Sequence, residues 1–434
     1  MLPSGAPLSE WLAWLETLSP TEINLGLERT ERVLERLELP RPPHVLLVAG
    51  TNGKGSSVAM TDALLRASGR RTGAYTSPHI SRFNERIVVE GIPASDADII
   101  AAFERVEAAR QEIELTYFEF GTLAAAVVFA AADLDVWILE VGLGGRLDAT
   151  NAIEPTASLI TNVSLDHCDW LGHDVESIAF EKVGVMRSGI PTVFGDRNVP
   201  ASVGRQALNV GARLLQAGRD YDFDIHEGGT WSWRGPSRTI GDLQAPGLMG
   251  EFQTGNAAAV LTLLEAAGLS DVVDTNLVTK VLPDVSLVGR LQRLIVDAPG
   301  SGGNEWLVDV AHNPAAAEAL ATALVAMRAD GETIAIVGLL DDKDVEGVIG
   351  PLLVHVDRWI AMSADSRRAI AANELARRVA NLAGRACLVV ESPAAAIESA
   401  RRTASKNDRI LATGSFFTVS PILEQLTTLS RTKS

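Results

Sequence analysis

Short apolar runs alternate with longer stretches of helical spacing along most of this chain. The runs are His44–Ala49, Val136–Val141, Leu159–Val163 and Thr192–Gly195 in the first half, and Trp306–Val310, Thr333–Val337, Arg358–Ala361, Ala386–Val390 and Arg409–Ala412 in the second. Nearly continuous apolar strands separated by helices are typical of a parallel sheet covered on both faces. The pattern therefore predicts an α/β protein with two sets of strands.

Two segments interrupt this alternation. From Asp222 to Arg234, apolar and polar residues alternate around a pair of glycines, which predicts a β-hairpin. We expect this hairpin to be a small antiparallel addition to the first domain. Pro283–Gly289 resembles a linker, and a chain of 434 residues is too long for one core. We therefore expect a first domain over residues 1–286 and a second over residues 287–434.

The composition narrows the classes of partner. With 38 Lys and Arg against 55 Asp and Glu, the formal net charge is −17, which disfavours non-specific binding to nucleic acids or anionic membranes. Cys168 and Cys387 show no paired spacing, so neither a disulfide framework nor a zinc knuckle is indicated. The N-terminus lacks the features of a signal peptide, and Leu123–Ala132 is too short to cross a bilayer. We expect a cytoplasmic protein that binds neither nucleic acid nor membrane.

The segment GTNGKGS follows the first apolar run and precedes a stretch of helical spacing from Ser57 to Ser68. A glycine-rich turn between a strand and a helix brings backbone N–H groups close to phosphate oxygens, and a lysine adds a positive charge. The residues concerned are Gly50, Thr51, Asn52, Gly53, Lys54, Gly55 and Ser56. The standard P-loop has glycine where this chain has Val48, and Ser or Thr where it has Gly55. An ordinary glycine-rich turn is the alternative.

Polar clusters follow other apolar runs, at the positions where α/β proteins bind ligands. Tyr75–Arg86 is dense in donors and acceptors, and could clamp a phosphate, organise a metal or be a solvated loop. Glu140 is an acid inside an apolar strand, which is costly unless the carboxylate is paired or bound to a cation. We favour a metal over the alternative, a buried ion pair with Arg146. For Lys182, which lies in a mostly apolar helix, the alternative is a surface pair with Glu181.

A third cluster, Asp166, His167 and Asp169, follows the strand Leu159–Val163. Imidazole is an uncommon ligand of Mg²⁺ and suits Mn²⁺ or Zn²⁺ better. In the second domain, polar residues again follow apolar runs: Asp309, His312 and Asn313 after one strand, and Ser415 after another, with Arg290 just after the linker. Polar strand ends in both domains predict one site in the cleft between them.

Taken together, these segments resemble the folylpolyglutamate synthase family. The matching segments occur in the family's order and are GTNGKGS, TSPHISRFNERI, LEVGLGGRLDATN, DHCDWLG, EKVGVMRSG, GRLQR, DVAHNP and GSF. The likeness extends from NLGLER at Asn24 to GSFFTVS at Ser420. The segments DHCDWLG, DVAHNP and GSFFTVS are similar to those of the bifunctional members, which are both dihydrofolate synthase and folylpolyglutamate synthase.

The resemblance implies a fold and a reaction. The fold is a P-loop ATPase domain followed by a Rossmann-like α/β domain. The reaction is an ATP-dependent ligation in which a substrate carboxylate takes the γ-phosphate of ATP, giving an acyl phosphate, and the amine of L-glutamate then displaces phosphate. Dihydropteroate would give dihydrofolate, and tetrahydrofolates would gain glutamates. We expect a monomer that uses these small molecules.

The resemblance also implies roles for single residues. Ser77 and Glu140 would hold Mg²⁺ on the phosphates, and Glu140 with His167 would hold a second Mg²⁺. Lys182 matches a lysine that is carbamoylated in the family, and is expected to act in catalysis together with Lys54, Glu140 and His167. Asn256, Arg290, Asp309 and His312 match residues on the nucleotide side. The candidates for contact with the pterin or glutamate are Leu25, Gly26, Leu27, Arg29, Arg82, Asp148 and Ser415.

The chain departs from the family pattern in a few places. Val183 and Val185 stand where Ala and Ile are usual, and Phe252 stands where many members have His, which bears on the expected base contact of Asn256. Gly55 is normal for the family.

Three other activities are alternatives to a bifunctional synthase. A folylpolyglutamate synthase without the dihydropteroate activity shares most of the motifs. A peptidoglycan-precursor amino-acid ligase has an extra N-terminal domain, for which the roughly 40 residues before the phosphate strand are too few. An ATP-binding switch protein has no need of a second metal or a modifiable lysine.

Overall fold

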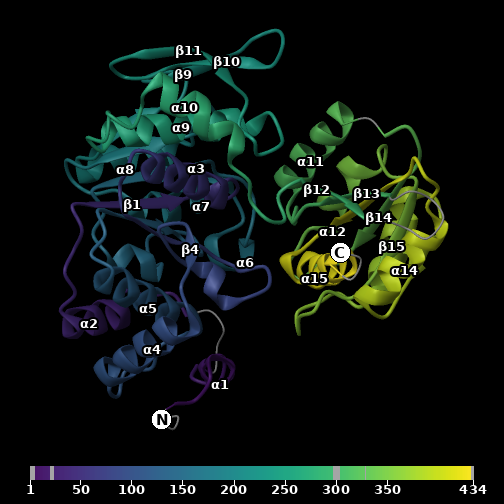
Figure 1. Cartoon of the computed structure of the whole chain (residues 1–434), viewed down its shortest axis with the longest axis horizontal. Coiled ribbons are helices and arrows are strands. Elements are labelled where there is room, and N and C mark those ends of the chain that lie inside the picture. The colour runs from purple at the N-terminus through teal and green to yellow at the C-terminus, as the bar shows by residue number, and fades with distance from the viewer. Residues whose placement is uncertain (1–4, 20–23, 297–303, 328, 432–434) are drawn as a thin grey trace. The chain divides into compact units, whose positions relative to one another are not determined.

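The computed structural model describes residues 5–19, 24–296, 304–327 and 329–431, and its contacts divide the chain into two compact units (Figure 1). The first contains the residues up to Ser164, Leu171–Gly247 and Thr254–Val285. The second contains Leu165–Trp170, Leu248–Gln253 and the residues from Ser286 onward. Two short segments from within the range 1–286 thus pack with the second unit.

The first unit is built on an eight-stranded sheet with the order β4-β3-β2-β5-β1-β6-β7-β8. The strands are β1 (His44–Ala49), β2 (Thr72–Tyr75), β3 (Ile87–Val89), β4 (Ile92–Pro93), β5 (Val136–Glu140), β6 (Ala157–Ile160), β7 (Pro191–Phe194) and β8 (Arg213–Gln216). Neighbouring strands from β2 to β8 pair in parallel, whereas β3 and β4 are antiparallel additions at one edge. Every residue of β5 is buried, as the apolar run predicts.

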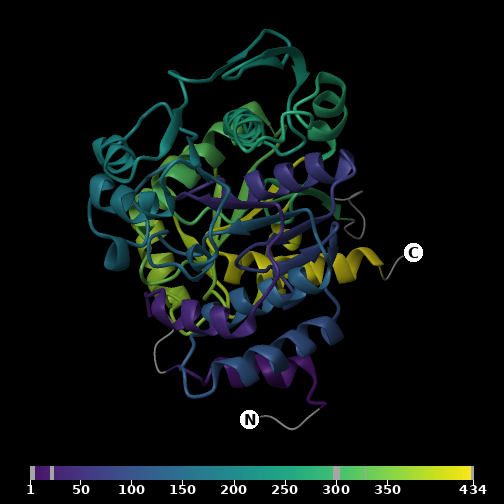
Figure 2. The ribbon, with the colours of Figure 1, turned by 90° about the vertical axis from the view of Figure 1, so that its left-hand side faces the viewer.

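Helices cover both faces of this sheet. They are α1 (Leu8–Leu15), α2 (Glu28–Leu37), α3 (Lys54–Ala67), α4 (Asp96–Arg110), α5 (Tyr117–Ala131), α7 (Val175–Lys182), α8 (Ala201–Val210), α9 (Phe252–Ala266) and α10 (Thr275–Val281), while the short α6 (Cys168–Leu171) begins in the second unit. Figures 1 and 2 show α3 on one face, and α5 with α4 and α2 on the other. A capping box between Thr116 and Glu119 begins α5, because each side chain accepts a hydrogen bond from the other residue's backbone N–H.

A separate three-stranded antiparallel sheet joins β9 (Asp222–Ile225), β10 (Thr230–Arg234) and β11 (Thr239–Gln244) in the order β11-β10-β9. It confirms the predicted hairpin, and β11 is an additional strand. Trp233 of β10 is buried, and its indole N–H donates to Thr262 of α9 at 3.0 Å. The sheet therefore packs on α9, as Figure 1 shows.

The predicted boundaries differ from the observed ones at two functional points. The helix after the glycine-rich turn begins at Lys54, not at Ser57. Strand β6 runs over Ala157–Ile160, so the prediction Leu159–Val163 was wrong at both ends. The chain leaves the sheet after Ile160 because the side chains of Thr161 and Asn162 hydrogen-bond the backbone of Asn52.

The second unit has a six-stranded sheet with the order β12-β13-β17-β14-β15-β16, in which only the edge strand β12 is antiparallel. The strands are β12 (Gln292–Val296), β13 (Asn304–Val308), β14 (Thr333–Val337), β15 (Arg358–Ala361), β16 (Cys387–Val389) and β17 (Arg409–Thr413). The helices are α11 (Pro314–Ala326), α12 (Val345–Ile349), α13 (Ala372–Ala383), α14 (Pro393–Thr403) and α15 (Phe416–Arg431). Residues of α11, α12 and α13 form one core with this sheet. This architecture confirms the predicted Rossmann-like α/β unit.

The remaining regular elements are short 3₁₀ turns. They are η1 (Phe83–Arg86), η2 (Ala149–Ala152), η3 (Val183–Val185), η4 (Leu282–Asp284) and η5 (Gly350–Leu352).

Candidate active site

The polar segments predicted from the sequence meet at one edge of the first sheet. The strands β2, β5, β1 and β6 are neighbours and parallel, so their carboxyl ends lie side by side. The Ser77 loop follows β2, Glu140 ends β5, the glycine-rich turn follows β1 and Asn162 follows β6. In open α/β sheets, ligands bind outside the carboxyl ends of the strands.

The glycine-rich turn needs its glycines. Gly50 has φ +142° and Gly53 has φ +85°, conformations that L side chains rarely adopt. A Cβ atom on Gly50 would lie 1.9 Å from Oγ1 of Thr161, and one on Gly53 would lie 2.8 Å from Oδ1 of Asn256. The turn therefore lies directly against Thr161 and the α9 residue Asn256, and leads into the N-terminus of α3, where anions are favoured.

The segment after β6 holds the turn in shape. The side chain of Asn162 accepts from Asn52 N and donates to Asn52 O, both at 3.0 Å. The Thr51 hydroxyl donates to Ser164 O at 3.2 Å and accepts from Ser164 N at 3.1 Å. These reciprocal bonds make the turn a preformed cradle that needs little ordering when a phosphate binds.

Two lysines converge on one carbonyl oxygen of this turn. Lys54 Nζ and Lys182 Nζ each donate to Gly50 O at 3.0 Å. Lys182 lies at the end of α7 and is buried. The predicted alternative, a surface pair between Lys182 and Glu181, is wrong, since Glu181 accepts from Arg146 at 2.8 Å.

Glu140 and Ser77 also come together. The buried Glu140 carboxylate accepts a hydrogen bond from the backbone N–H of Ser77 at 3.1 Å. The alternative of an ion pair between Glu140 and Arg146 is not what the structure shows, because Arg146 pairs with Glu181. A carboxylate and a hydroxyl at the same strand edge are the oxygen donors that Mg²⁺ prefers.

The loop from Ser77 to Arg86 is ordered by its own side chains. The Glu85 carboxylate accepts from the backbone N–H groups of Ile80, Ser81 and Arg82 at 2.7–2.9 Å. His79 Nδ1 accepts from Arg86 Nε at 2.8 Å. Burial, followed by the Arg86 charge, lowers the pKa of His79 to about 4. The predicted substrate residue Arg82 is exposed and pairs with Asp96 at 3.0 Å.

The segment expected to contact the pterin lies beside the loop after β5. The backbone N–H of Gly26, which lies between Leu25 and Leu27, donates to Leu147 O at 3.3 Å. Arg29 is held by Glu119 at 2.8 Å and by Asn24 O at 2.6 Å. Its guanidinium therefore fixes the shape of this segment.

Asp148 is likewise enclosed by its own loop. Its carboxylate accepts from Leu143 N and from the backbone and hydroxyl of Thr150. Burial raises the pKa of Asp148.

In the second unit, predicted residues lie at the carboxyl ends of the neighbouring strands β13 and β17. The partly buried Asp309 accepts from Leu291 N and Ala311 N, both at 2.8 Å, and desolvation raises its pKa against the opposing charge of Arg290. Arg290 stacks over the Phe416 ring with its Cζ 5.0 Å from the centroid. Phe416 was not predicted as a site residue, although it is part of the GSF segment named in the sequence analysis.

His312 and Ser415 complete this edge. The His312 ring lies 6.2 Å from the same Phe416 ring, and its Nδ1 contacts Val310 O at 2.8 Å. Ser415 is buried, and its hydroxyl accepts from Phe417 N at 3.1 Å at the start of α15. Arg290, Asp309, His312 and Ser415 are thus grouped around Phe416 and the ends of two strands.

An ion cluster in the second unit includes two residues that the sequence analysis missed, Lys343 and Asp342. Asp166 and His167 lie in the segment Leu165–Trp170, and Lys343 Nζ lies 2.7 Å from Asp166 Oδ1. The loop after β14 carries Lys343, so the signal that marked the other candidates, polar residues after an apolar strand, was also present there.

Within the described ranges, no three His, Cys, Asp or Glu side chains form a ready ligand cluster for a metal. A cation held by Ser77 and Glu140 would need further oxygen ligands, which phosphate groups supply. Cys168 and Cys387 are not joined to each other. Nor is any helix of the described part both long and apolar enough to span a bilayer.

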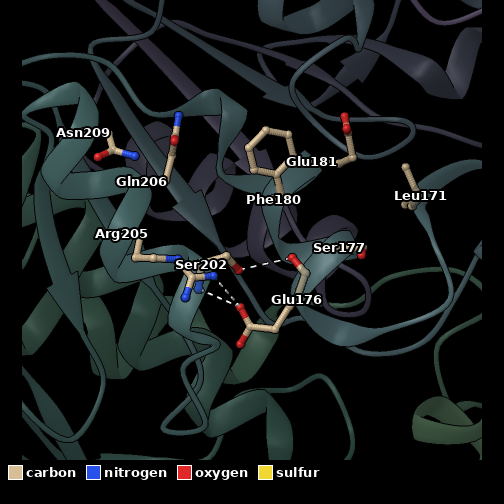
Figure 3. Close-up of a pocket in the computed structure, with 9 residues that line it drawn as sticks. All are labelled: Leu171, Glu176, Ser177, Phe180, Glu181, Ser202, Arg205, Gln206 and Asn209. Carbon is tan, nitrogen blue, oxygen red and sulfur yellow. Dashed lines mark hydrogen bonds and ion pairs between the residues drawn. The ribbon is translucent and has the colours of Figure 1, made fainter.

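A pocket of about 450 Å³ lies between α7 and α8 in the first unit (Figure 3). It is lined by Leu171, Glu176, Ser177, Phe180, Glu181, Ser202, Arg205, Gln206 and Asn209. Glu176 accepts from the backbone N–H groups of Ala201 and Ser202, both at 2.7 Å, and so links α7 to the start of α8. None of the predicted site residues lines this pocket.

Comparison with known proteins agrees with this arrangement. The Mur ligase middle domain matches residues 48–264, and the Mur ligase glutamate ligase domain matches residues 289–416. The dihydrofolate synthase/folylpolyglutamate synthase of Escherichia coli (strain K12) is 38% identical over 422 residues, which cover 97% of this chain and 96% of that protein. The chain belongs to the dihydrofolate synthase/folylpolyglutamate synthase family.

Solved members of the family have the same fold. The structure of E. coli FolC in complex with DHPP and ADP has a TM-score of 0.91 and 37% identity, and each chain is covered to 100%. A bifunctional folylpolyglutamate synthase/dihydrofolate synthase with Mn, AMPPNP and L-glutamate bound has a TM-score of 0.89 and 37% identity, with coverage of 98% and 99%. The predicted resemblance and fold class are confirmed.

Proposed function

We propose that this protein is an ATP-dependent ligase that joins L-glutamate to dihydropteroate, giving dihydrofolate, and to tetrahydrofolates, giving polyglutamates. The observation that carries the proposal is the preformed phosphate cradle, with two lysines on Gly50 O and the buried Glu140 at the end of the next strand. The full-length likeness to the bifunctional E. coli enzyme supports the choice of substrates.

The reaction has two steps. A carboxylate oxygen of the pteroate or folate attacks the γ-phosphorus of ATP, and ADP leaves, giving an acyl phosphate. The neutral amine nitrogen of glutamate then attacks the acyl carbon, the C–O bond to phosphate breaks, and the nitrogen loses one proton to solvent, leaving an amide N–H. Because two anions must meet in the first step, catalysis requires positive charge that is already in place. Lys54 and the N–H groups of the turn supply part of it.

A divalent cation would supply the rest by neutralising the phosphate oxygens. Ser77 and Glu140 have oxygen donors of the type that would hold Mg²⁺ on the nucleotide, and the hydrogen bond from Ser77 N to the Glu140 carboxylate keeps the two residues together. His167 would contribute a ligand to a second cation. Its imidazole suits Mn²⁺ better than Mg²⁺, and the family member with Mn and AMPPNP bound is consistent with a cation of this kind.

Carbamoylation of Lys182 fits its surroundings. Lys54 and Lys182 share one carbonyl oxygen, so two positive charges at this point would repel each other. Attack of the neutral Lys182 amine on CO₂ forms an N–C bond and releases one proton, which turns the side chain into an anion. The product would relieve the repulsion and help to order the cations.

The remaining predicted residues have proposed roles in binding. Gly50, Thr51, Asn52, Gly53, Lys54, Gly55 and Ser56 cradle the phosphates, and Asn256, Arg290, Asp309 and His312 contact the nucleotide. Arg82 and Ser415 serve the glutamate. Leu25, Gly26 and Leu27 contact the pterin. Arg29 and Asp148 support this contact through their hydrogen bonds, Arg29 with Glu119 and Asp148 with the backbone of its own loop.

We further propose that residues 1–286 act as the ATPase domain and residues 287–434 as the ligase domain of a cytoplasmic monomer. A folylpolyglutamate synthase without dihydropteroate activity, a peptidoglycan-precursor ligase and an ATP-binding switch are the competing functions. These functions differ in the acceptor that ADP release requires: tetrahydrofolate alone for the monofunctional synthase, a peptidoglycan precursor for the second, and no acceptor for the switch.

Release of ADP by the purified protein tests the proposal. The assay contains ATP, Mg²⁺ and L-glutamate, with either dihydropteroate or tetrahydrofolate as the acceptor. We expect sustained ADP release with each acceptor, and no more than about one ADP per protein molecule when glutamate is omitted, because the acyl phosphate then cannot react further. Release with tetrahydrofolate alone would assign the monofunctional activity, while release that ignores both acceptor and glutamate would assign a switch. Lys54→Ala serves as the inactive control.

A further inference from the structure

Lys343 is enclosed by carboxylates in the second unit. Its ammonium lies 2.7 Å from Asp166 Oδ1 and 3.3 Å from Asp342 Oδ2, and only 7% of its side chain is exposed. A charge removed from water to this degree requires paired neighbours. Lys343 therefore joins two carboxylates that come from distant parts of the sequence.

The loop that carries Lys343 is itself held in place. Lys343 N donates to Leu340 O at 3.2 Å, and Asp341 N donates to Arg368 O at 2.8 Å. The side chain of Arg368 reaches Asp342 Oδ1 at 2.8 Å. The backbone of Lys343 is thus fixed in a braced loop at the end of β14, and its ammonium extends from this loop to Asp166 and Asp342.

Both carboxylate oxygens of Asp166 accept hydrogen bonds from neighbouring residues. The oxygen that accepts from Lys343 also accepts from the backbone N–H of His167 at 2.9 Å. The other oxygen accepts from Asn313 Nδ2 at 2.9 Å. Asn313 is fixed in turn, because its Oδ1 caps α11 by accepting from Ala316 N at 2.9 Å. Asp166 is therefore held by Lys343 and Asn313, and it in turn holds the backbone N–H of His167.

The imidazole of His167 lies beside both carboxylates that Lys343 contacts. His167 Nε2 is 3.9 Å from Asp166 Oδ2, and Nδ1 is 4.0 Å from Asp342 Oδ2. His167 also has φ +50°, a left-handed conformation that is unfavourable for a residue with a Cβ atom. A turn of this kind persists when its surroundings hold it.

We propose that Lys343 is a positioning residue for His167: by binding Asp166 and Asp342, it fixes the direction in which His167 presents its imidazole to a divalent cation. This inference rests on the proposed metal role of His167. Lys343 of the second domain would thus orient His167, which precedes that domain by more than one hundred positions in the chain.

A competing role for Lys343 is direct contact with an anionic substrate group. The enclosure of the ammonium by Asp166 and Asp342 disfavours it, because an incoming carboxylate would have to displace a buried partner at 2.7 Å. The two roles predict different measurements.

The experiment compares Mn²⁺ binding among variants in the presence of AMPPNP, using the electron paramagnetic resonance signal of free Mn²⁺. We expect Lys343→Met to weaken Mn²⁺ binding about 10- to 100-fold, the usual effect of losing a partner that orients a metal ligand. Lys343→Arg should recover part of the affinity. Lys280→Met, an exposed lysine of α10, is the matched control and should bind Mn²⁺ like the wild type.

The variant Asp166→Asn tests whether Lys343 acts on His167 through Asp166. If Lys343 acts through Asp166, the double variant Lys343→Met/Asp166→Asn binds Mn²⁺ no more weakly than Asp166→Asn alone. The double variant keeps the net charge of the cluster, so it also replaces Lys343→Met if that single variant does not fold.

His167→Ala calibrates the assay. Weak Mn²⁺ binding by His167→Ala together with unchanged binding by folded Lys343→Met would overturn the inference and leave the proposed function intact. Unchanged binding by His167→Ala would instead contradict the metal role of His167. A raised KM for glutamate in Lys343→Met, with Mn²⁺ affinity unchanged, would assign Lys343 to the substrate and overturn the positioning role.

Discussion

Glu140→Gln separates the catalytic role of the carboxylate from its structural role. In the wild type, the buried carboxylate accepts a hydrogen bond from Ser77 N at 3.1 Å. A glutamine at this position has nearly the same shape and keeps an acceptor oxygen for that bond. An alanine would leave the Ser77 N–H without this acceptor, at a cost of about 1–3 kcal/mol in folding free energy. Glutamine therefore removes the charge while leaving the fold largely unchanged.

The expected loss of activity follows from that charge. Removing one preorganised electrostatic contact to a transition state costs about 2.7–4 kcal/mol, or about 100- to 1,000-fold in turnover. The free energy of unfolding without ligand should change by less than about 1 kcal/mol, since the neutral hydrogen bond remains. Turnover and stability should thus respond very differently to the same substitution.

Three measurements on the same preparations test this prediction. They are ADP release at saturating substrates, urea unfolding without ligand, and the gain in thermal stability when Mn²⁺ and AMPPNP are added. A tenfold loss of ligand affinity lowers that gain by about 1.4 kcal/mol at saturating ligand. Glu107→Gln is the control, because Glu107 is a mostly buried carboxylate of α4 that pairs with Arg110 outside the strand edge.

Turnover close to the wild-type value in a folded Glu140→Gln would refute the assignment of Glu140. Lost turnover with an unchanged gain in stability from Mn²⁺ and nucleotide would also contradict it, since the carboxylate would then act without holding a cation.

Three further predictions concern other parts of the first unit. Lys182→Ala should lower turnover about 100-fold, and acetate or another short carboxylate should restore part of it in an ADP-release assay; no restoration would count against a carbamate. Arg29→Met, which removes the contacts with Glu119 and Asn24 O, should lower activity with dihydropteroate about tenfold and affect tetrahydrofolate less, whereas equal losses would show that the segment does not discriminate. Burial lowers the pKa of His79 to about 4, so its contribution to stability is fully present above its unfolded pKa near 6.5 and is lost as the pH falls towards 4, because the unfolded chain takes up the proton first. Between pH 7 and pH 4, the free energy of unfolding should therefore fall by about 2 kcal/mol less in His79→Gln than in the wild type, after allowance for partial exposure. Urea unfolding at both pH values measures this difference, and an equal fall in the two proteins would contradict the prediction.

The sequence predicted the parts of the fold that depend on local pattern. The runs His44–Ala49 and Thr333–Val337 are strands with those boundaries, because fully buried parallel strands need continuous apolar residues. Strands such as β12 (Gln292–Val296) were missed, since an edge strand that is partly exposed carries polar residues and lacks a continuous run.

Side-chain contacts between residues far apart in the chain could not be predicted from the sequence pattern. Lys343 and Asp166 are 177 positions apart, and Arg29 and Glu119 are 90 apart. The interpretation of Arg146 failed for a related reason. Although it lies near Glu140 in the sequence, the glycine-rich chain between them turns away and places Arg146 beside Glu181 on α7. The candidate residues at strand ends were predicted because parallel strands bring their carboxyl ends to one edge, whatever their separation along the chain.

The position of a divalent cation tests the central claim most directly. Anomalous X-ray diffraction from crystals grown with Mn²⁺ and AMPPNP locates the metal independently of the nucleotide. We predict an anomalous peak at ligand distance from the Glu140 carboxylate, next to the phosphate groups in the turn that holds Lys54. Well-ordered nucleotide in that turn, without any anomalous peak beside Glu140, would contradict the account.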